Sequence, residues 1–87
     1  MTYEWDEAKN QFNLVKHGID FADIERFDWD HAVSIPSDRH GESRIASIGN
    51  LDGLLHFVVY TIREPNRRII SLRRASDKER ELYDRLS

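Results

Sequence analysis

The segment that most constrains the fold is residues 54–62, which are almost continuously apolar. A strand that buries one face alternates apolar and polar residues, whereas an apolar run implies that both faces are covered. We therefore predict that residues 54–62 form the central strand of a sheet. Polar turns flank this segment: residues 50–53 end in a glycine that can take positive φ, and residues 64–66 contain a proline that presets a corner.

Three further segments have the two-residue period of β-strands: residues 32–35, 44–49 and 67–73. A polar loop at residues 37–42 separates the first two. The connections between the four strands are short, whereas a parallel connection needs about a dozen residues or more. We therefore predict a four-stranded antiparallel meander.

The first predicted helix covers residues 6–17. Asp6 is suited to cap its amino terminus, and Gly18 is suited to the left-handed position that ends many helices. The last turn of the helix contains Lys16 and His17, where the helix dipole favours cations. The apolar side chains recur at three- and four-residue spacing: Ala8, Phe12 and Val15.

Two more helices have recognisable starts. Asp20 is a second candidate cap, for a short helix that ends near Asp28, and residues 29–31 are a connector. Near the other end of the chain, Ser76 and Glu79 have the spacing of a capping box. The predicted fold is α+β in a single domain spanning residues 1–87, with two N-terminal helices, a four-stranded antiparallel meander and a C-terminal helix.

Length and cysteine content limit how such a domain gains stability. A domain of 87 residues buries only about 60% of its unfolded surface, so a protein partner would add useful stability. The chain has no cysteine, which excludes disulfides and thiolate metal sites and fits a reducing compartment. No stretch approaches the roughly 20 apolar residues of a membrane span, and residues 1–10 do not resemble a signal peptide. We expect a cytoplasmic protein with no membrane partner.

The chain has a net charge of −3, but the charge is unevenly distributed. Residues 1–38 contain three basic and nine acidic side chains, whereas residues 39–87 contain ten basic and seven acidic ones. Residues 63–74 are the most basic segment, with five arginines and one glutamate. Such a local patch can attract a polyanion, because its field extends about 8–10 Å at physiological salt. The alternative interpretation is that these arginines lie on a solvent-exposed edge of the sheet, where charged side chains prevent aggregation.

Several classes of chemistry have no support in the sequence. The four histidines lie at positions 17, 31, 40 and 56, without the spacing of metal ligands. The chain also lacks a glycine-rich phosphate loop and the Gly-x-Ser-x-Gly motif of serine hydrolases. We therefore expect no metal site and no cofactor.

General acid–base chemistry on a phosphodiester does have support. Cleavage by a 2′-hydroxyl needs a base for that hydroxyl, an acid for the leaving 5′-oxygen and cations for the charged transition state. Side chains of these types are present: Lys9, Lys16, His17, Arg44, Arg63, Arg73 and Tyr83. Each also has a structural interpretation, as a helix-end cation, a core aromatic or a surface charge. The residue types alone leave both interpretations open.

A longer pattern resembles one known family. Its opening part comprises Trp5-Asp6, Lys9, Asn13, Lys16-His17-Gly18 and Phe21. Its second part comprises Arg44, Gly49, Tyr60-Thr61-x-Arg63, Arg68-Ile69-Ile70-Ser71-x-Arg73-x-Ala75, Glu79 and Tyr83. Together these residues, in this order and spacing over about residues 3–83, resemble the BrnT family of RelE-like toxins.

The resemblance implies a ribonuclease toxin that arrests translation, needs no cofactor and is held inactive by a BrnA-type antitoxin. The antitoxin would carry the DNA-binding part of the complex, so this chain would contact DNA only indirectly. The positions that match the family pattern are predicted to be catalytic: Lys9, His17, Arg44, Arg63, Arg73 and Tyr83. Further basic residues are predicted to bind the RNA substrate: Lys16, Arg67, Arg68 and Arg74.

Two features depart from the family pattern. The chain is acidic whereas such toxins tend to be basic, and residues 64–66 replace a glycine-containing link. The alternative function is therefore a degenerate toxin that acts only as the antitoxin-binding subunit of an operon-repressing complex. Direct DNA binding is not expected, because no predicted helix has a basic face suited to the major groove.

Overall fold

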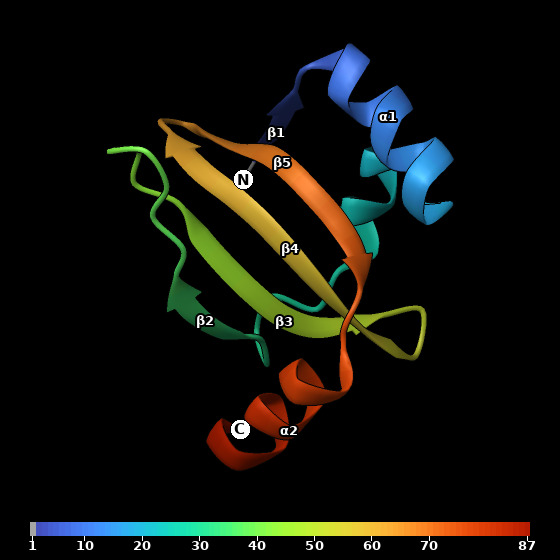
Figure 1. Ribbon diagram of the computed structural model, residues 1–87, viewed down its shortest axis with the longest axis vertical. Helices are drawn as coiled ribbons and strands as arrows, with labels where there is room; N and C mark the ends of the chain where they lie inside the picture. The colour runs from blue at the N-terminus through green and yellow to red at the C-terminus, as the bar shows by residue number, and fades with distance from the viewer. Residues whose placement is uncertain (1) are drawn as a thin grey trace.

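A five-stranded mixed sheet forms the centre of the computed structural model, which describes residues 2–87 (Figure 1). The strands in chain order are β1 (Thr2–Trp5), β2 (Val33–Pro36), β3 (Ile45–Leu51), β4 (Leu54–Arg63) and β5 (Asn66–Arg74). Their order across the sheet is β1-β5-β4-β3-β2. The helical elements are α1 (Glu7–His17), the 3₁₀ helix η1 (Phe21–Arg26) and α2 (Asp77–Leu86).

The predicted α+β class, the central strand and the meander are confirmed. The apolar run forms β4, the middle strand of the sheet, and β2 to β5 pair antiparallel in chain order. The expectation that both faces of β4 are covered is only partly correct. His56, Val58 and Tyr60 are buried on one face, whereas Phe57 and Val59 on the other are half-exposed. The second face is therefore an open apolar floor.

The N-terminal part of the prediction is wrong in two details. The first element of the described residues is a strand that was not predicted, β1, which pairs in parallel with β5 from Thr2 opposite Asn66 to Trp5 opposite Ile69. The second predicted helix is the short 3₁₀ helix η1, although its predicted cap is correct: the Asp20 carboxylate accepts a hydrogen bond from the Ala22 amide. The sheet is consequently five-stranded and mixed instead of four-stranded and antiparallel.

The core lies between the sheet and the segment that contains η1. Its buried side chains come from η1, the residues after it and the covered faces of three strands: Phe21, Ile24, Phe27, Leu51, Val58, Tyr60, Ile69 and Leu72. Trp29, which was predicted to lie in a connector, packs against this core. Its indole N–H donates to the Tyr3 hydroxyl at 2.7 Å, and its ring meets Tyr60 edge-on at a centroid distance of 5.2 Å.

Helix α1 packs against the sheet through amides instead of apolar side chains. The buried residues of α1 are Asn10 and Asn13. Asn13 donates to the Leu72 carbonyl at 2.8 Å and accepts from the Leu72 amide at 3.2 Å. Strand β1 pairs with β5 only as far as Ile69. Beyond that point, Asn13 takes the place of a neighbouring strand and bonds the backbone groups of Leu72 at the edge of β5. The apolar spacing correctly predicted a helix, but Phe12 and Val15 face solvent.

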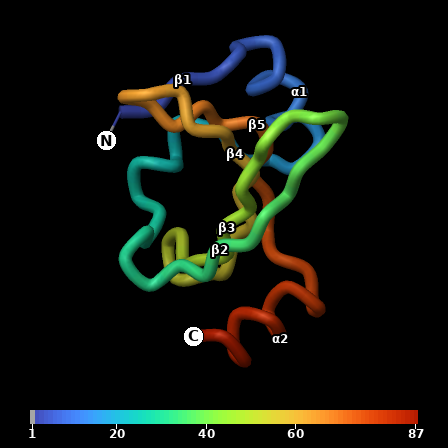
Figure 2. Tube along the Cα trace, turned by 90° about the vertical axis from the view of Figure 1, so that its left-hand side faces the viewer, coloured from blue at the N-terminus to red at the C-terminus, as the bar shows by residue number. Residues whose placement is uncertain are grey.

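The loop between β2 and β3 lies on the side of the sheet opposite the core segment. Figure 2 shows this loop reaching toward α1, while the chain from η1 to β2 passes on the other side of the strands. Helix α2 lies at the other end of the sheet and contacts β3 (Figure 1). The β2–β3 loop and the end of α1 border the open face of β4 and β5.

Candidate functional site

A cleft of about 500 Å³ opens on the half-exposed face of the sheet. Phe57 and Val59 of β4, with Ile70 and Ser71 of β5, form its floor, which is apolar except for the Ser71 hydroxyl. Around the floor stand side chains from the end of α1, the loop between β2 and β3, and β5: Lys16, His17, Ser37, Arg39, Arg44 and Arg73. Five of the ten lining residues are basic, and none of those drawn from residues 2–87 is acidic. We call this feature the basic cleft.

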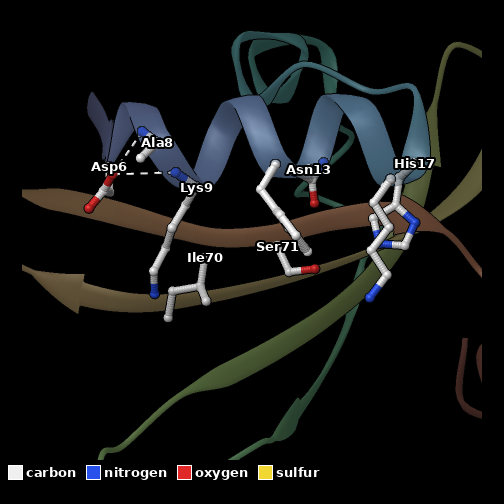
Figure 3. A pocket seen from close by; sticks show the side chains of 9 residues that line it. Asp6, Ala8, Lys9, Asn13, His17, Ile70 and Ser71 are labelled. Atoms are coloured by element: carbon white, nitrogen blue, oxygen red, sulfur yellow. Dashed lines mark hydrogen bonds between the residues drawn. The ribbon is translucent and has the colours of Figure 1, made fainter.

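A second hollow of about 420 Å³ adjoins the basic cleft along α1. Lys16, His17, Ile70 and Ser71 line both spaces. The other lining residues all belong to α1 or its cap: Asp6, Ala8, Lys9, Phe12 and Asn13. Figure 3 shows Lys9 and His17 pointing from α1 toward the sheet, where Ile70 and Ser71 lie on β5. We call this second space the α1 hollow.

A β-bulge in β5 shapes the floor that the two spaces share. Val59 pairs with Ser71 whereas the next residue, Tyr60, pairs with Ile69, so Ile70 is an extra residue in β5. A bulge locally breaks the alternation of side chains between the two faces of a sheet. Ile70 and Ser71, although adjacent in sequence, consequently both line the cleft and the hollow.

His17 occupies the last turn of α1 and lines both spaces. Gly18 follows it in the left-handed conformation with φ of 72°, and its amide donates to the Leu14 carbonyl at 2.8 Å. Partial burial lowers the pKa of His17 below its ordinary value, and the positive charges of Lys16 and Arg73 lower it further. His17 is therefore predominantly neutral at pH 7 and can accept a proton.

This depressed pKa gives a direct prediction. The midpoint of the His17 titration should lie below 6.5 in the folded chain, and Arg73→Ala should raise it because one cation is removed. The folded state binds this proton less readily than the unfolded state, so stability should fall as pH decreases from about 6.5 through the folded pKa. The imidazole resonances followed by NMR across pH 4–8 measure the midpoint. A midpoint above 6.5 in the parent chain would contradict the assignment.

Arg73 is oriented by a carboxylate outside the cleft. Its guanidinium donates to both carboxylate oxygens of Glu79, each at 2.8 Å, and lies 4.4 Å from the centre of the Phe57 ring. Burial favours the protonated form of Glu79, but its bonds from Arg73 and Ser76 outweigh this effect, so its pKa is lowered. Glu79 thus stays ionised at pH 7 and fixes Arg73 against the cleft floor.

Arg44 is oriented in a similar way by Glu42. The two side chains form an ion pair at 3.0 Å, and the Arg44 side chain is 22% exposed. The hydrogen bond from Arg44 is the main cause that lowers the pKa of Glu42, and the charges of Arg63 and Lys9 lower it further. Glu42 therefore lies within the field of three cations predicted to be catalytic.

The structure brings four of the predicted site residues together in the basic cleft, namely Lys16, His17, Arg44 and Arg73. Lys9 lies in the adjoining α1 hollow. Arg63 is exposed at the end of β4 and does not line either space. Tyr83 is half-buried on α2 and also lies outside both.

The remaining predicted RNA-binding arginines lie away from the cleft. Arg67 packs on the core side of the sheet, with its guanidinium 3.7 Å from the centre of the Trp29 ring. Arg68 pairs with Glu4 at 2.8 Å, and Arg74 is exposed at the end of β5. The basic segment is therefore not one surface, because its arginines are divided between two faces of the sheet.

Sequence reasoning missed two polar residues of the cleft from the β2–β3 loop, Ser37 and Arg39, and the floor residue Ser71. The loop was predicted correctly, but no local signal shows that it folds back toward α1. Within residues 2–87, no group of three or more histidine, aspartate or glutamate side chains is placed to hold a metal ion. No helix in the same range is long and apolar enough to cross a membrane.

The chain matches the sequence model of a family described as the ribonuclease toxin, BrnT, of type II toxin–antitoxin systems, over residues 5–79. The chain therefore belongs to the BrnT family, which confirms the resemblance found in the sequence. Among solved structures it is similar to the ribonuclease toxin BrnT of Brucella abortus, with a TM-score of 0.71 and 33% sequence identity. That match covers 88% of this chain and 100% of the Brucella chain. No curated protein matches the chain.

Proposed function

We propose that this chain is a metal-independent endoribonuclease that cleaves RNA in the basic cleft and thereby inhibits translation. The observation that carries the proposal is the composition of the cleft: it combines a neutral histidine with one lysine and three arginines, and no carboxylate from residues 2–87 lines it. Such a site attracts a phosphodiester and stabilises its negative charge without a metal ion. Family membership supports ribonuclease activity at the level of the family.

In the proposed reaction, His17 accepts the proton of a ribose 2′-hydroxyl. The 2′-oxygen then forms a bond to phosphorus, and the bond from phosphorus to the 5′-oxygen breaks. The ammonium group of Lys9 or Lys16 donates a proton to the leaving 5′-oxygen. The products are a 2′,3′-cyclic phosphate and a 5′-hydroxyl end, so every proton and bond is accounted for without a cofactor.

Three arginines stabilise the transition state in this proposal: Arg39, Arg44 and Arg73. Their planar guanidinium groups can bind two phosphate oxygens at once, which a lysine cannot do. Arg63 and Arg74 lie beyond the cleft and are assigned to the outer path of the RNA. Arg67 and Arg68 are assigned structural roles, because Arg67 stacks on the Trp29 ring and Arg68 forms an ion pair with Glu4. Tyr83 remains a predicted catalytic residue without a contact to the cleft.

Membership of a type II toxin–antitoxin family implies an antitoxin partner. We infer that this partner is a BrnA-type protein, that it covers the basic cleft, and that DNA contacts occur through the antitoxin alone. The cytoplasm is the proposed location, because a toxin that inhibits translation by cleaving RNA must act where translation takes place.

Incubation of purified chain with RNA in excess EDTA tests the proposal. Cleavage should proceed at the rate measured with added Mg²⁺, and the fragments should carry 2′,3′-cyclic phosphates. The Arg73→Ala variant, purified identically, controls for contaminating ribonuclease. Cleavage abolished by the chelator would contradict the metal-independent mechanism. No RNA loss at all would instead favour the degenerate, antitoxin-binding subunit.

A further inference from the structure

Helix α1 exposes an apolar stripe on the side that faces away from the core. Ala8, Phe12 and Val15 follow one another at four- and three-residue spacing, which places them on one face of the helix. Phe12 is 68% exposed and Val15 is 88% exposed, while the buried side of the same helix contains two asparagines. This distribution is the reverse of an ordinary surface helix. We call these three residues the α1 stripe.

The α1 stripe is continuous with the candidate site. Ala8 and Phe12 belong to the stripe and also line the α1 hollow. The hollow in turn shares His17 and Ile70 with the basic cleft. A ligand seated on the stripe can therefore extend through the hollow to the cleft without a break in the surface.

The charge of the hollow defines the chemistry of its occupant. Lys9 and Lys16 line it, and neither forms an ion pair with another residue of the range 2–87. Asp6 also lines the hollow, but its carboxylate accepts hydrogen bonds from the amides of Ala8 and Lys9, at 2.8 and 3.3 Å. The Lys16 ammonium also lies 5.8 Å from the centre of the Phe12 ring. Two ammonium groups without a carboxylate partner in this range, beside an apolar stripe, fit a segment that presents apolar side chains and carboxylates together.

We propose that the antitoxin inhibits this toxin by laying an acidic amphipathic segment along α1. Its apolar side chains cover the α1 stripe, its carboxylates pair with Lys9 and Lys16, and the segment continues over the mouth of the basic cleft. The inhibitory part of this proposal rests on the proposed function of the cleft. A stable interface removes roughly 800 Å² from each partner, more than one helix stripe supplies, so the segment must extend beyond α1.

Other occupants fit the surface less well. An RNA backbone gains nothing from a nearly fully exposed valine, because phosphates prefer cations and polar donors. A second copy of this chain packed through α1 would bring the lysines of the two helices close together. Both are outcomes that the experiment distinguishes.

The test compares Val15→Glu with Leu86→Glu, a matched control on α2 that is 56% exposed and distant from the stripe. Binding of the antitoxin encoded in the same operon is measured by calorimetry, and RNA cleavage is measured separately. Val15→Glu should weaken antitoxin binding by about 30-fold or more, the scale of an interface hot spot, and leave RNA cleavage unchanged. Leu86→Glu should change neither. Val15→Gln, which introduces no charge and lies outside the α1 hollow, is a second variant with the same expected direction, should Val15→Glu fold poorly.

If both stripe variants bind the antitoxin as tightly as the parent chain does, the proposal is overturned. Lost RNA cleavage with unchanged antitoxin binding would assign the stripe to the substrate and also overturn it. A concentration-dependent dimer of the parent that Val15→Glu dissociates, with antitoxin binding unchanged, would assign the stripe to self-association. Absence of RNA cleavage in the parent would refute the proposed function, whereas the comparison of antitoxin affinities would still decide the docking site.

Discussion

Arg73→Ala should lower the rate of RNA cleavage by about 100- to 1,000-fold, the scale observed when one donor to a charged transition state is removed. Arg73 lines the basic cleft, and its guanidinium is fixed by two hydrogen bonds to Glu79 and by the Phe57 ring. A donor held in place before the reaction costs little reorganisation when charge develops on the phosphate. Initial rates on a defined RNA at equal soluble protein measure the effect.

The same substitution also removes an ion pair, so the structural contribution needs its own control. Glu79→Gln breaks the ion pair with Arg73 but retains the guanidinium in the cleft. If Arg73 acts on the phosphate, Glu79→Gln should lower the rate by much less than Arg73→Ala, because the guanidinium stays in the cleft although it is less firmly held. Arg73→Lys should restore only part of the activity that Arg73→Ala loses, because lysine is a point charge without the planar fork. Equal losses in Arg73→Ala and Glu79→Gln would show that activity depends on the ion pair and would contradict a direct contact between Arg73 and the phosphate.

Local signals explain which parts of the fold could be predicted from the sequence. The capping box of α2 is such a case: Ser76 accepts from the Glu79 amide and Glu79 accepts from the Ser76 amide, as their spacing indicated. Strand β1 had no comparable signal. Its partner on β5 is more than 60 residues away, and no turn connects the two. The only local indication of a strand is that Tyr3 and Trp5 alternate with polar residues, and a segment of four residues is too short for such a pattern to distinguish a strand from a loop.

The candidate site was predictable in its chemistry but not in its geometry. His17, Arg44 and Arg73 were identified by residue type and family pattern, and the structure places them around one cleft. The sequence did not predict that the arginines of residues 63–74 would lie on two different faces of the sheet. Strict alternation along β5 would put Arg67 and Arg73 on the same face, because their positions differ by six, an even number. The bulge at Ile70 reverses the alternation, so Arg67 stacks on Trp29 while Arg73 lines the cleft.

The orientation of α1 could not be predicted either, because apolar periodicity normally marks the buried side of a helix. In this chain the side that faces the sheet is polar, and two asparagines replace the expected apolar contacts. Asn10 accepts from the Phe21 amide at 2.8 Å and donates to the Asp20 carboxylate at 3.1 Å. Hydrogen bonds to specific backbone atoms are a tertiary feature that a periodicity analysis does not detect.

Asn13→Ala should therefore cause a large loss of stability, about 2–4 kcal/mol in the free energy of unfolding. Asn13 is 4% exposed, donates to the carbonyls of Ile19 and Leu72 at 3.0 and 2.8 Å, and accepts from the Leu72 amide. Alanine leaves the Ile19 carbonyl, and the Leu72 carbonyl and amide at the edge of β5, without this partner. Each unsatisfied group costs about 1–3 kcal/mol. Small domains are stable by only about 5–15 kcal/mol, so urea unfolding should show a clearly lower midpoint.

Two further variants separate the hydrogen bonds of Asn13 from general effects on α1. Gln11→Ala removes an exposed side chain that donates to Glu7 at 3.0 Å, and should change stability by less than about 0.5 kcal/mol. Asn13→Asp keeps the shape of the side chain but places carboxylate oxygens against two carbonyls, so it should destabilise at least as much as alanine. Because α1 carries Lys9, Lys16 and His17 into the site, both Asn13 variants should also cleave RNA more slowly below their melting temperatures. Asn13→Ala with the stability of the parent would show that α1 is held to the sheet by other contacts.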